Sequence, residues 1–117
     1  TSAGEPRCLQ LHLEPCESAQ QRQQLQERVR QRWEASELGE RVRVQTREEL
    51  LDGGWFGPVE DLRPEVVGRI GDLVITPLED DLALHDLSRI GPQTLQMVGQ
   101  HGAVTPAETR VPLLRLA

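Results

Sequence analysis

Leucines alternate with polar residues near the start of the chain, and this pattern constrains the fold more than any other. Leu9, Leu11 and Leu13 occupy every second position within residues 8–14. Successive side chains of a strand point to opposite faces, so this alternation is typical of a half-buried β-strand that ends before Pro15. The sequence therefore predicts a sheet with one apolar face.

A helix is predicted next, over about residues 18–36. Ser18 lies three residues before a glutamine, which is the spacing of a capping box at the start of a helix. Leu25, Val29 and Trp33 then recur at every fourth position among Gln, Arg and Glu residues. Such a narrow apolar stripe covers one face of a sheet and leaves the other faces of the helix in water.

The rest of the chain continues this mixture of strands and short helices. Further capping boxes are predicted at Thr46 and Thr105. The remaining expected elements are a strand at 42–45, helices at 46–51, 63–70 and 95–98, hairpin strands at 73–76 and 82–87, and a final strand at 111–116. This order predicts an α+β fold with a mostly antiparallel sheet and helices on one face.

Size and charge limit the classes of function. The 117 residues suffice for one modest core, and 37% of them are hydrophobic. The net charge of −6 argues against binding to nucleic-acid polymers or anionic membranes. No apolar run is long enough to span a membrane, so we expect a cytoplasmic protein. All 13 basic residues are arginine, a bias of the whole chain that identifies no phosphate site by itself.

The titratable residues form no complete catalytic constellation. Of the three histidines, His12 and His85 lie in predicted strands and are expected to have no catalytic role. His101 lies in a glycine-flanked turn, where a side chain can point into a cleft. Glu108 is explained as a helix-capping residue, and Cys8 and Cys16 are expected to stay unpaired. The chain is therefore either not an enzyme or part of one.

Three segments nevertheless occur in a familiar order. They are residues 4–7 before the first strand, residues 46–58 continuing to 69–72, and residues 99–114. The third is the most specific, with a His-Gly pair, a Thr-Pro-x-Glu sequence and then Val-Pro-Leu-Leu. In order and spacing the chain resembles the C-terminal portion of actinobacterial alkaline-phosphatase-superfamily proteins, of the type I phosphodiesterase/nucleotide pyrophosphatase family.

The resemblance implies a role within a larger enzyme. Such relatives fold as an α/β/α sandwich that holds two divalent metals, usually zinc, and they hydrolyse phosphoric esters with a Thr or Ser nucleophile. That nucleophile and most metal ligands lie upstream of the region this chain resembles. The last ligand corresponds to His101. One histidine cannot hold zinc tightly, so the chain alone is expected to be inactive and free of tightly bound metal.

The resemblance also implies how the chain is organised. Residues 1–3 are expected to be a linker, residues 4–88 an α+β cap inserted beside the active site, and residues 89–117 the return to the catalytic core. Trp55 and Phe56 would pack the small core of the cap, or one of them would stack on a nucleobase. Arg63 and Arg69 could reach a substrate phosphate.

Two other functions remain open on the sequence. The chain could be a stand-alone ferredoxin-like α+β module for binding or dimerisation, or a purely structural interaction domain. Integral packing of residues 89–117 would favour such a module, whereas a fragment should anchor this tail poorly. The expected partners are the N-terminal catalytic portion, a small phosphate-ester substrate, and a second copy paired through the edge strand within 111–117.

Overall fold

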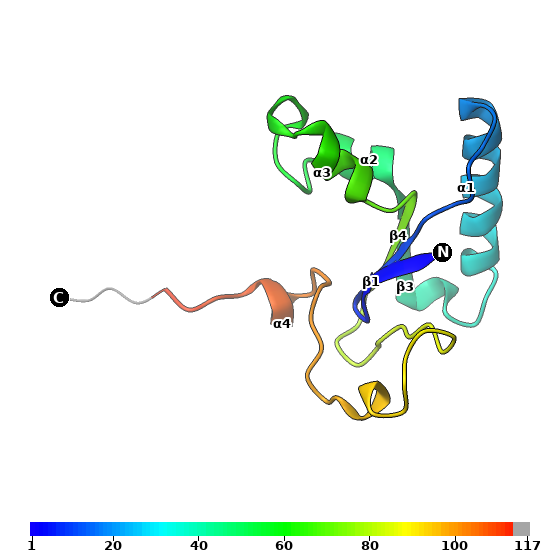
Figure 1. The fold of residues 1–117 in the computed structure, drawn as a ribbon. Coiled ribbons are helices and arrows are strands. Elements are labelled where there is room, and N and C mark those ends of the chain that lie inside the picture. Colours follow the sequence, from blue (N-terminus) through cyan, green and yellow to red (C-terminus); the bar gives the residue numbers. More distant parts are fainter. Residues whose placement is uncertain (114–117) are drawn as a thin grey trace.

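Four strands form one antiparallel sheet in the spatial order β1-β2-β4-β3. The computed structural model describes residues 1–113 (Figure 1). The strands are β1 (Ser2–Glu5), β2 (Cys8–Leu11), β3 (Val42–Thr46) and β4 (Leu73–Pro77). The helices are α1 (Ala19–Glu34), α2 (Arg47–Asp52), α3 (Pro64–Arg69) and α4 (Pro106–Thr109), with 3₁₀ turns at Gly39–Arg41, Val59–Asp61 and Thr94–Gln96. The α+β class predicted from the sequence is confirmed.

Strand β4 lies inside the sheet because its residues are apolar on both faces. All five residues from Leu73 to Pro77 are buried, and the strand pairs with β2 on one side and β3 on the other. The prediction that 82–87 would pair with it in a hairpin is wrong, since both edges of β4 are already occupied. That segment instead crosses the end of the β1–β2 hairpin, where the Leu84 N–H donates to the carbonyl of Pro6 at 2.6 Å.

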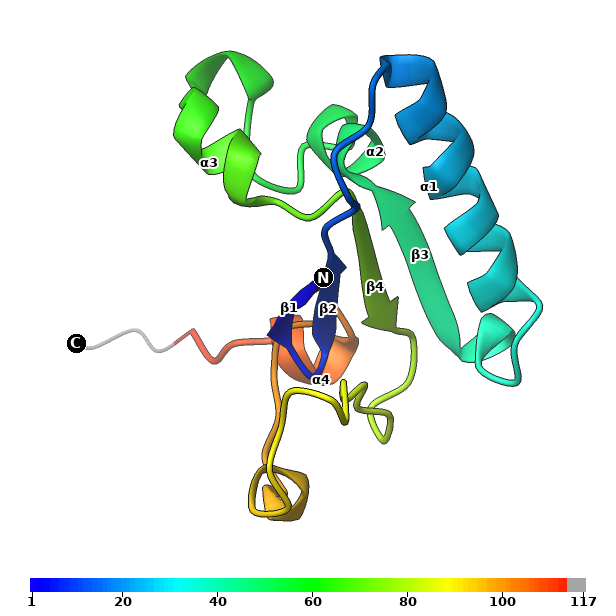
Figure 2. The ribbon, with the colours of Figure 1, turned by 45° about the vertical axis from the view of Figure 1, so that its right-hand side comes forward.

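The connection from β2 through α1 to β3 leaves a gap that β4 fills. Both β2 and β3 run antiparallel to β4, so they run parallel to each other on either side of it. This arrangement is a split β-α-β unit, the motif found in ferredoxin-like folds. Strand β1 extends the sheet beyond β2, and α1 lies along the β3 side of one face (Figure 2).

Helix α1 begins where the sequence predicts. The Ser18 hydroxyl accepts the Gln21 N–H at 3.1 Å, and the helix ends at Glu34, just before the predicted boundary. Its stripe packs Val29 and Trp33 on the main core cluster. The buried members of that cluster come from the sheet and the loop after it: Val42, Val44, Leu73, Ile75 and Leu84.

Helix α2 has the complete capping box that the sequence predicts at Thr46. The Thr46 side chain accepts the Glu49 N–H, and the Glu49 carboxylate accepts the Thr46 N–H at 2.8 Å. Leu50 is only 1% exposed and packs on Ile70 and Val74. Because Val74 points away from the face that α1 covers, the helices contact both faces of the sheet, whereas the sequence predicted one.

The start of the chain differs from its prediction as a linker. Residues 2–5 form β1, whose Ser2 pairs with Leu11 and whose Glu5 pairs with Cys8. The short Ser-Ala-Gly-Glu sequence has no apolar alternation, so only the neighbouring β2 reveals it as a strand. Strand β2 itself ends at Leu11 because the Leu13 N–H turns to the Asp72 carboxylate at 2.8 Å.

The C-terminal part contains less regular structure than predicted. The expected helix at 95–98 is a single 3₁₀ turn, Thr94–Gln96, with Leu95 and Met97 exposed. Residues 111–113 of the expected final strand form no strand, and Leu113 is 98% exposed. The rest of that predicted strand, 114–116, lies outside the described residues. No helix within residues 1–113 has the length and apolar character needed to cross a membrane.

Candidate functional site

The turn between β1 and β2 contains a buried arginine. Arg7 is 3% exposed, although the turn lies at the edge of the sheet. Its Nε donates to Glu108 Oε1 at 2.7 Å and its Nη2 to Glu108 Oε2 at 2.9 Å. We call this bidentate ion pair the Arg7–Glu108 clamp. It joins the first hairpin, near the start of the chain, to α4, near the end of the sequence.

The remaining guanidinium nitrogen holds the loop that follows β4. Arg7 Nη1 donates to the carbonyls of Glu79 at 3.0 Å, Asp80 at 3.2 Å and Leu82 at 2.6 Å. The rigid fork of an arginine suits such simultaneous contacts better than the single ammonium of a lysine. One side chain therefore links the hairpin, the 79–82 loop and α4.

The Glu108 carboxylate also shapes the segment that precedes it. Its Oε1 accepts the Ala103 N–H at 3.1 Å and its Oε2 accepts the Thr105 hydroxyl at 2.8 Å. Ala103 and Thr105 are 9% and 5% exposed. The capping box predicted at Thr105 is not formed, because the Thr105 side chain donates to Glu108 instead of accepting its N–H. We call residues 102–108 the docked segment.

Hydrogen bonding lowers the pKa of Glu108 to about 2. The main cause is the Arg7 guanidinium, and the Thr105 hydroxyl and the Ala103 N–H contribute further. The carboxylate is thus fully ionised at neutral pH and is satisfied by donors from three residues.

Gly102 brings the docked segment against the hairpin. Its φ of +122° lies in the region that favours glycine. A Cβ at this position would lie 3.2 Å from the Cβ of Cys8 and 3.5 Å from the Cβ of Glu5. The close approach and the backbone conformation together require glycine here.

His101 comes directly before this contact and is exposed. On its N-terminal side Val98 is 99% exposed, whereas Gln100 is half-buried and lines a hollow together with Arg7 and residues 80–83. The imidazole therefore stands at the surface, at the point where an exposed loop meets the docked segment. A histidine in this position can offer one nitrogen to a metal ion or to a proton transfer.

The predicted substrate-binding residues lie elsewhere. Trp55 and Phe56 follow α2 and are 36% and 44% exposed, so they pack less than core aromatics would. Arg63 is the N-cap residue of α3 and Arg69 is its last residue, and both are exposed. In both ribbon views α3 and α4 lie at different ends of the sheet. The structure does not bring these four residues together with His101.

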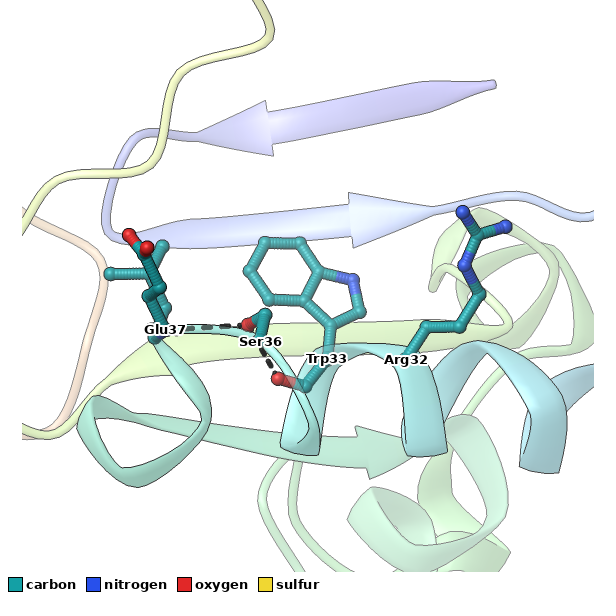
Figure 3. Close-up of a pocket in the computed structure, with 5 residues that line it drawn as sticks. Arg32, Trp33, Ser36 and Glu37 are labelled. Carbon is teal, nitrogen blue, oxygen red and sulfur yellow. Dashed lines mark hydrogen bonds between the residues drawn. The ribbon is translucent and has the colours of Figure 1, made fainter.

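A separate hollow of about 440 Å³ lies at the end of α1. Figure 3 shows the Trp33 indole turned toward the strands, with Arg32 and Glu37 on either side. The Ser36 hydroxyl donates to the Trp33 carbonyl at 2.6 Å, which closes the end of the helix. Among the described residues, Arg32 and Glu37 form no ion pair with each other and the indole lies between them, so the hollow resembles a gap beside the core more than a reaction site.

The described residues do not by themselves fit a zinc site. Zinc in proteins takes three or four ligands from His, Cys, Asp and Glu. Within residues 1–113 there is no group of three such residues that could hold a metal ion. His101 can supply one ligand, and any other ligands would come from outside the described part of the chain. Cys8 and Cys16 are both free, and burial raises the pKa of the Cys8 thiol.

Comparisons with protein families, with curated proteins and with solved structures find no match to this chain. The assignment of a function therefore depends on the site itself and on the sequence segments described above.

The sequence singles out His101 as a candidate ligand and assigns Glu108 only a capping role, and it does not predict the burial of Arg7. Glu108 was explained by its neighbours alone, and Arg7 was one of many arginines in the chain. The available signal was its position in a Pro-Arg turn that precedes an apolar strand. A charged residue there has no obvious local partner, yet its actual partner lies a hundred residues away.

Proposed function

We propose that this chain is the C-terminal portion of a divalent-metal-dependent phosphodiesterase or nucleotide pyrophosphatase, in which His101 is a metal ligand. The observation that carries this proposal is the exposed His101 beside Gly102, held against the first hairpin by the docked segment. The same residues make up the His-Gly and Thr-Pro-x-Glu sequences on which the family resemblance depends.

The geometry supports a role for these sequences beyond capping a helix. Gly102 permits the close approach to Cys8, Thr105 is buried, and Glu108 binds both Thr105 and Arg7. Three positions of the characteristic segment thus have specific contacts, whereas His101 has its side chain free at the surface. An exposed histidine on this turn is available to a metal site whose other ligands come from another part of the protein.

The remaining parts of the proposal concern the surroundings of His101. An upstream catalytic portion would supply the nucleophile and the other metal ligands, since the described residues contain no group of three that could hold a metal ion. The sheet and α1–α3 would then form a cap beside the active site, and small phosphate esters would be the substrates. We place the protein in the cytoplasm as part of this proposal.

The decisive experiment compares variants of a longer polypeptide that contains both the upstream catalytic portion and this chain. Hydrolysis of bis-p-nitrophenyl phosphate and zinc content by mass spectrometry would be measured for wild type, His101→Ala and the matched control His12→Ala. We expect His101→Ala to lower zinc content and rate together, and His12→Ala to leave both unchanged. Equal zinc content and equal rate in wild type and His101→Ala would contradict the proposal.

A second candidate function is supported by the uncovered part of the sheet. Helix α1 contacts β3, while a hollow of about 340 Å³ remains over the β1–β2 side. Its lining includes Leu9, Leu11, Trp33 and Leu84. Ferredoxin-like folds commonly carry another helix in this place, so a stand-alone dimerisation module could cover it with a second copy. Sedimentation of a strictly monomeric species at high concentration would contradict this candidate.

A further inference from the structure

Residues 91–100, which we call the linker, join two parts of the chain that are both fixed to the first hairpin. Before the linker, Leu84 is 6% exposed and its N–H donates to the Pro6 carbonyl at 2.6 Å. After it, Glu108 of the docked segment binds Arg7 at 2.7 Å and 2.9 Å. The linker therefore connects two anchored ends, and its conformation decides which hairpin the docked segment can reach.

The linker itself makes few contacts with the rest of the molecule. Within the part of the chain that the structure describes, its hydrogen bonds join linker residues only to one another. Leu95, Met97 and Val98 are 50%, 60% and 99% exposed. A hollow of about 370 Å³ is lined by linker residues and by residues 80–83, and Figure 2 shows the linker as a loop that extends away from the sheet. The linker can therefore open with little loss of packing.

The contact between the docked segment and the hairpin needs nothing from the linker. The two oxygens of Glu108 accept hydrogen bonds from Arg7. Gly102 approaches Cys8 so closely that a Cβ added to the glycine would lie 3.2 Å from the Cβ of Cys8. The hairpin of a second copy presents the same guanidinium and the same surface, so it would accept the segment with the same hydrogen bonds. Exchange of an identical element between copies is a low-cost route to a dimer.

Exchange would also cover apolar side chains that a closed chain leaves in water. The two linkers of an exchanged dimer run between the same two copies, so Leu95, Met97 and Val98 of one linker can pack on those of the other. Removal of apolar surface from water favours association. The tether opposes exchange, because a short flexible linker keeps the segment at an effective concentration in the millimolar range. The dimer should therefore form as the protein concentration approaches about 1 mM.

We infer that the hairpin surface around Arg7 binds the docked segment of a second copy, so that two chains exchange residues 102–108 and form a dimer. This inference stands apart from the role proposed for His101. It also differs from a dimer through the uncovered part of the sheet, in which the Arg7–Glu108 clamp would have no part.

The first test looks for the exchanged contact directly. Equal amounts of ¹³C-labelled and unlabelled chain 1–117 would be unfolded together, refolded and concentrated to about 1 mM. Isotope-filtered NMR then detects nuclear Overhauser effects between protons of different chains only. We expect such interchain effects between Cys8 and Gly102, together with a dimer in sedimentation. Cys8–Gly102 effects within single chains only, at this concentration, would overturn the inference.

The second test removes the carboxylate of the clamp. Sedimentation would be measured for wild type, Glu108→Ala and the matched control Glu79→Ala. The control also removes a carboxylate that pairs with an arginine, Arg41 at 2.6 Å, but it keeps the carbonyl that Arg7 contacts. We expect wild-type association in the control and at least about tenfold weaker association in Glu108→Ala. Association of equal strength in all three proteins would place the interface elsewhere, as on the uncovered sheet, and would overturn the inference.

A shortened linker tests the same exchange without changing the clamp, in case Glu108→Ala disturbs the fold. A chain that lacks residues 91–94 retains the clamp, the hairpin and the apolar linker residues, but its linker reaches about 13 Å less far. Closure within one chain then becomes harder, whereas exchange between chains does not. We expect this variant to dimerise at a concentration at least about tenfold lower than wild type. A shortened chain that associates no more tightly than wild type would overturn the inference.

Discussion

At the scale of single residues, the docked segment depends on the charge of Glu108 and on the backbone conformation of Gly102. The carboxylate of Glu108 accepts hydrogen bonds from three other residues, and Gly102 has the backbone conformation and the space that the contact requires. Each detail leads to a separate expectation, since one concerns ionisation and the other the shape of the backbone.

The stability of the Arg7–Glu108 contact should depend on pH. The pKa of Glu108 is about 2 in the folded protein, below its ordinary value of 4.5. A carboxyl whose pKa is lowered on folding contributes stability above its unfolded pKa, and this contribution is lost as the pH falls toward the folded pKa. We therefore expect Glu108→Gln to lower the free energy of unfolding at neutral pH. The difference from wild type should shrink steadily between about pH 4.5 and pH 2.

Urea unfolding of wild type and Glu108→Gln at several pH values would measure this difference. Other carboxylates, such as Asp86, titrate in the same range, but they are present in both proteins and cancel. A difference that is constant from neutral to acidic pH would contradict the assignment of the low pKa to Glu108.

Substitution of Gly102 should weaken the docked segment. Gly102→Ala introduces a Cβ at 3.2 Å from that of Cys8 and places alanine at a φ of +122°. A non-glycine residue in such a conformation costs about 1–3 kcal/mol. We expect a loss of this order in the free energy of unfolding. We also expect the NMR chemical shifts of Cys8 to change. Gly99→Ala is the matched control, because a Cβ at Gly99 meets nothing within 4 Å.

At the scale of elements, the starts of the helices are decided locally, whereas the pairing of the strands is not. Thr46 and Glu49 form both hydrogen bonds of a capping box, and Ser18 caps α1. Strand β4 receives its position from partners far along the chain. Asp72, at its start, accepts the N–H of Leu13 and pairs with Arg22 and Arg47, so it ties the end of β2, α1 and α2 together.

Removal of the side-chain cap of α2 should lower the free energy of unfolding. Thr46→Ala deletes the hydroxyl that accepts the Glu49 N–H at 3.2 Å and leaves that donor without its partner. Loss of such a cap typically costs about 1 kcal/mol. Chemical denaturation should detect this loss in Thr46→Ala. Thr94→Ala is the control, since no residue caps the 3₁₀ turn at Thr94–Gln96 through its side chain, and an equal loss there would contradict a specific role for Thr46.

At the scale of the whole molecule, the apolar core is concentrated on the sheet. Leu73 and Ile75 are completely buried between α1 and the neighbouring strands. After residue 100, the described part of the chain contributes only Ala103 to the buried apolar residues and leaves Val111 and Leu113 at 81% and 98% exposure. Stability should therefore depend on the sheet and its covering helix far more than on the residues after α4.

Two leucine substitutions should show this contrast. Leu73→Ala leaves a cavity in the centre of the core and should lower the free energy of unfolding by about 3 kcal/mol or more. Leu113→Ala removes the same atoms from an exposed position and should change stability by less than about 0.5 kcal/mol. Thermal unfolding followed by circular dichroism would compare both with wild type. A comparable loss in both variants would mean that residue 113 is buried in solution.

The sequence by itself determined the local features of this protein. Alternating leucines identified β2, the period of Leu25, Val29 and Trp33 identified α1, and the Thr46 capping box identified the start of α2. These signals are local because they depend on side-chain direction and on hydrogen bonds between near neighbours. The α+β class follows from them. The role expected of His101 came from the family resemblance, and Glu108 was expected only to cap a helix.

Only the tertiary structure decided which segments lie together. The hairpin predicted for 82–87 failed because β2 and β3 occupy both edges of β4, and β1 exists only because β2 offers it an edge. The Arg7–Glu108 clamp depends on the same closure of the fold, since its partners are a hundred residues apart in sequence. Periodicity and spacing carry no information over such distances, because long-range pairing is set by the shared burial of many residues at once.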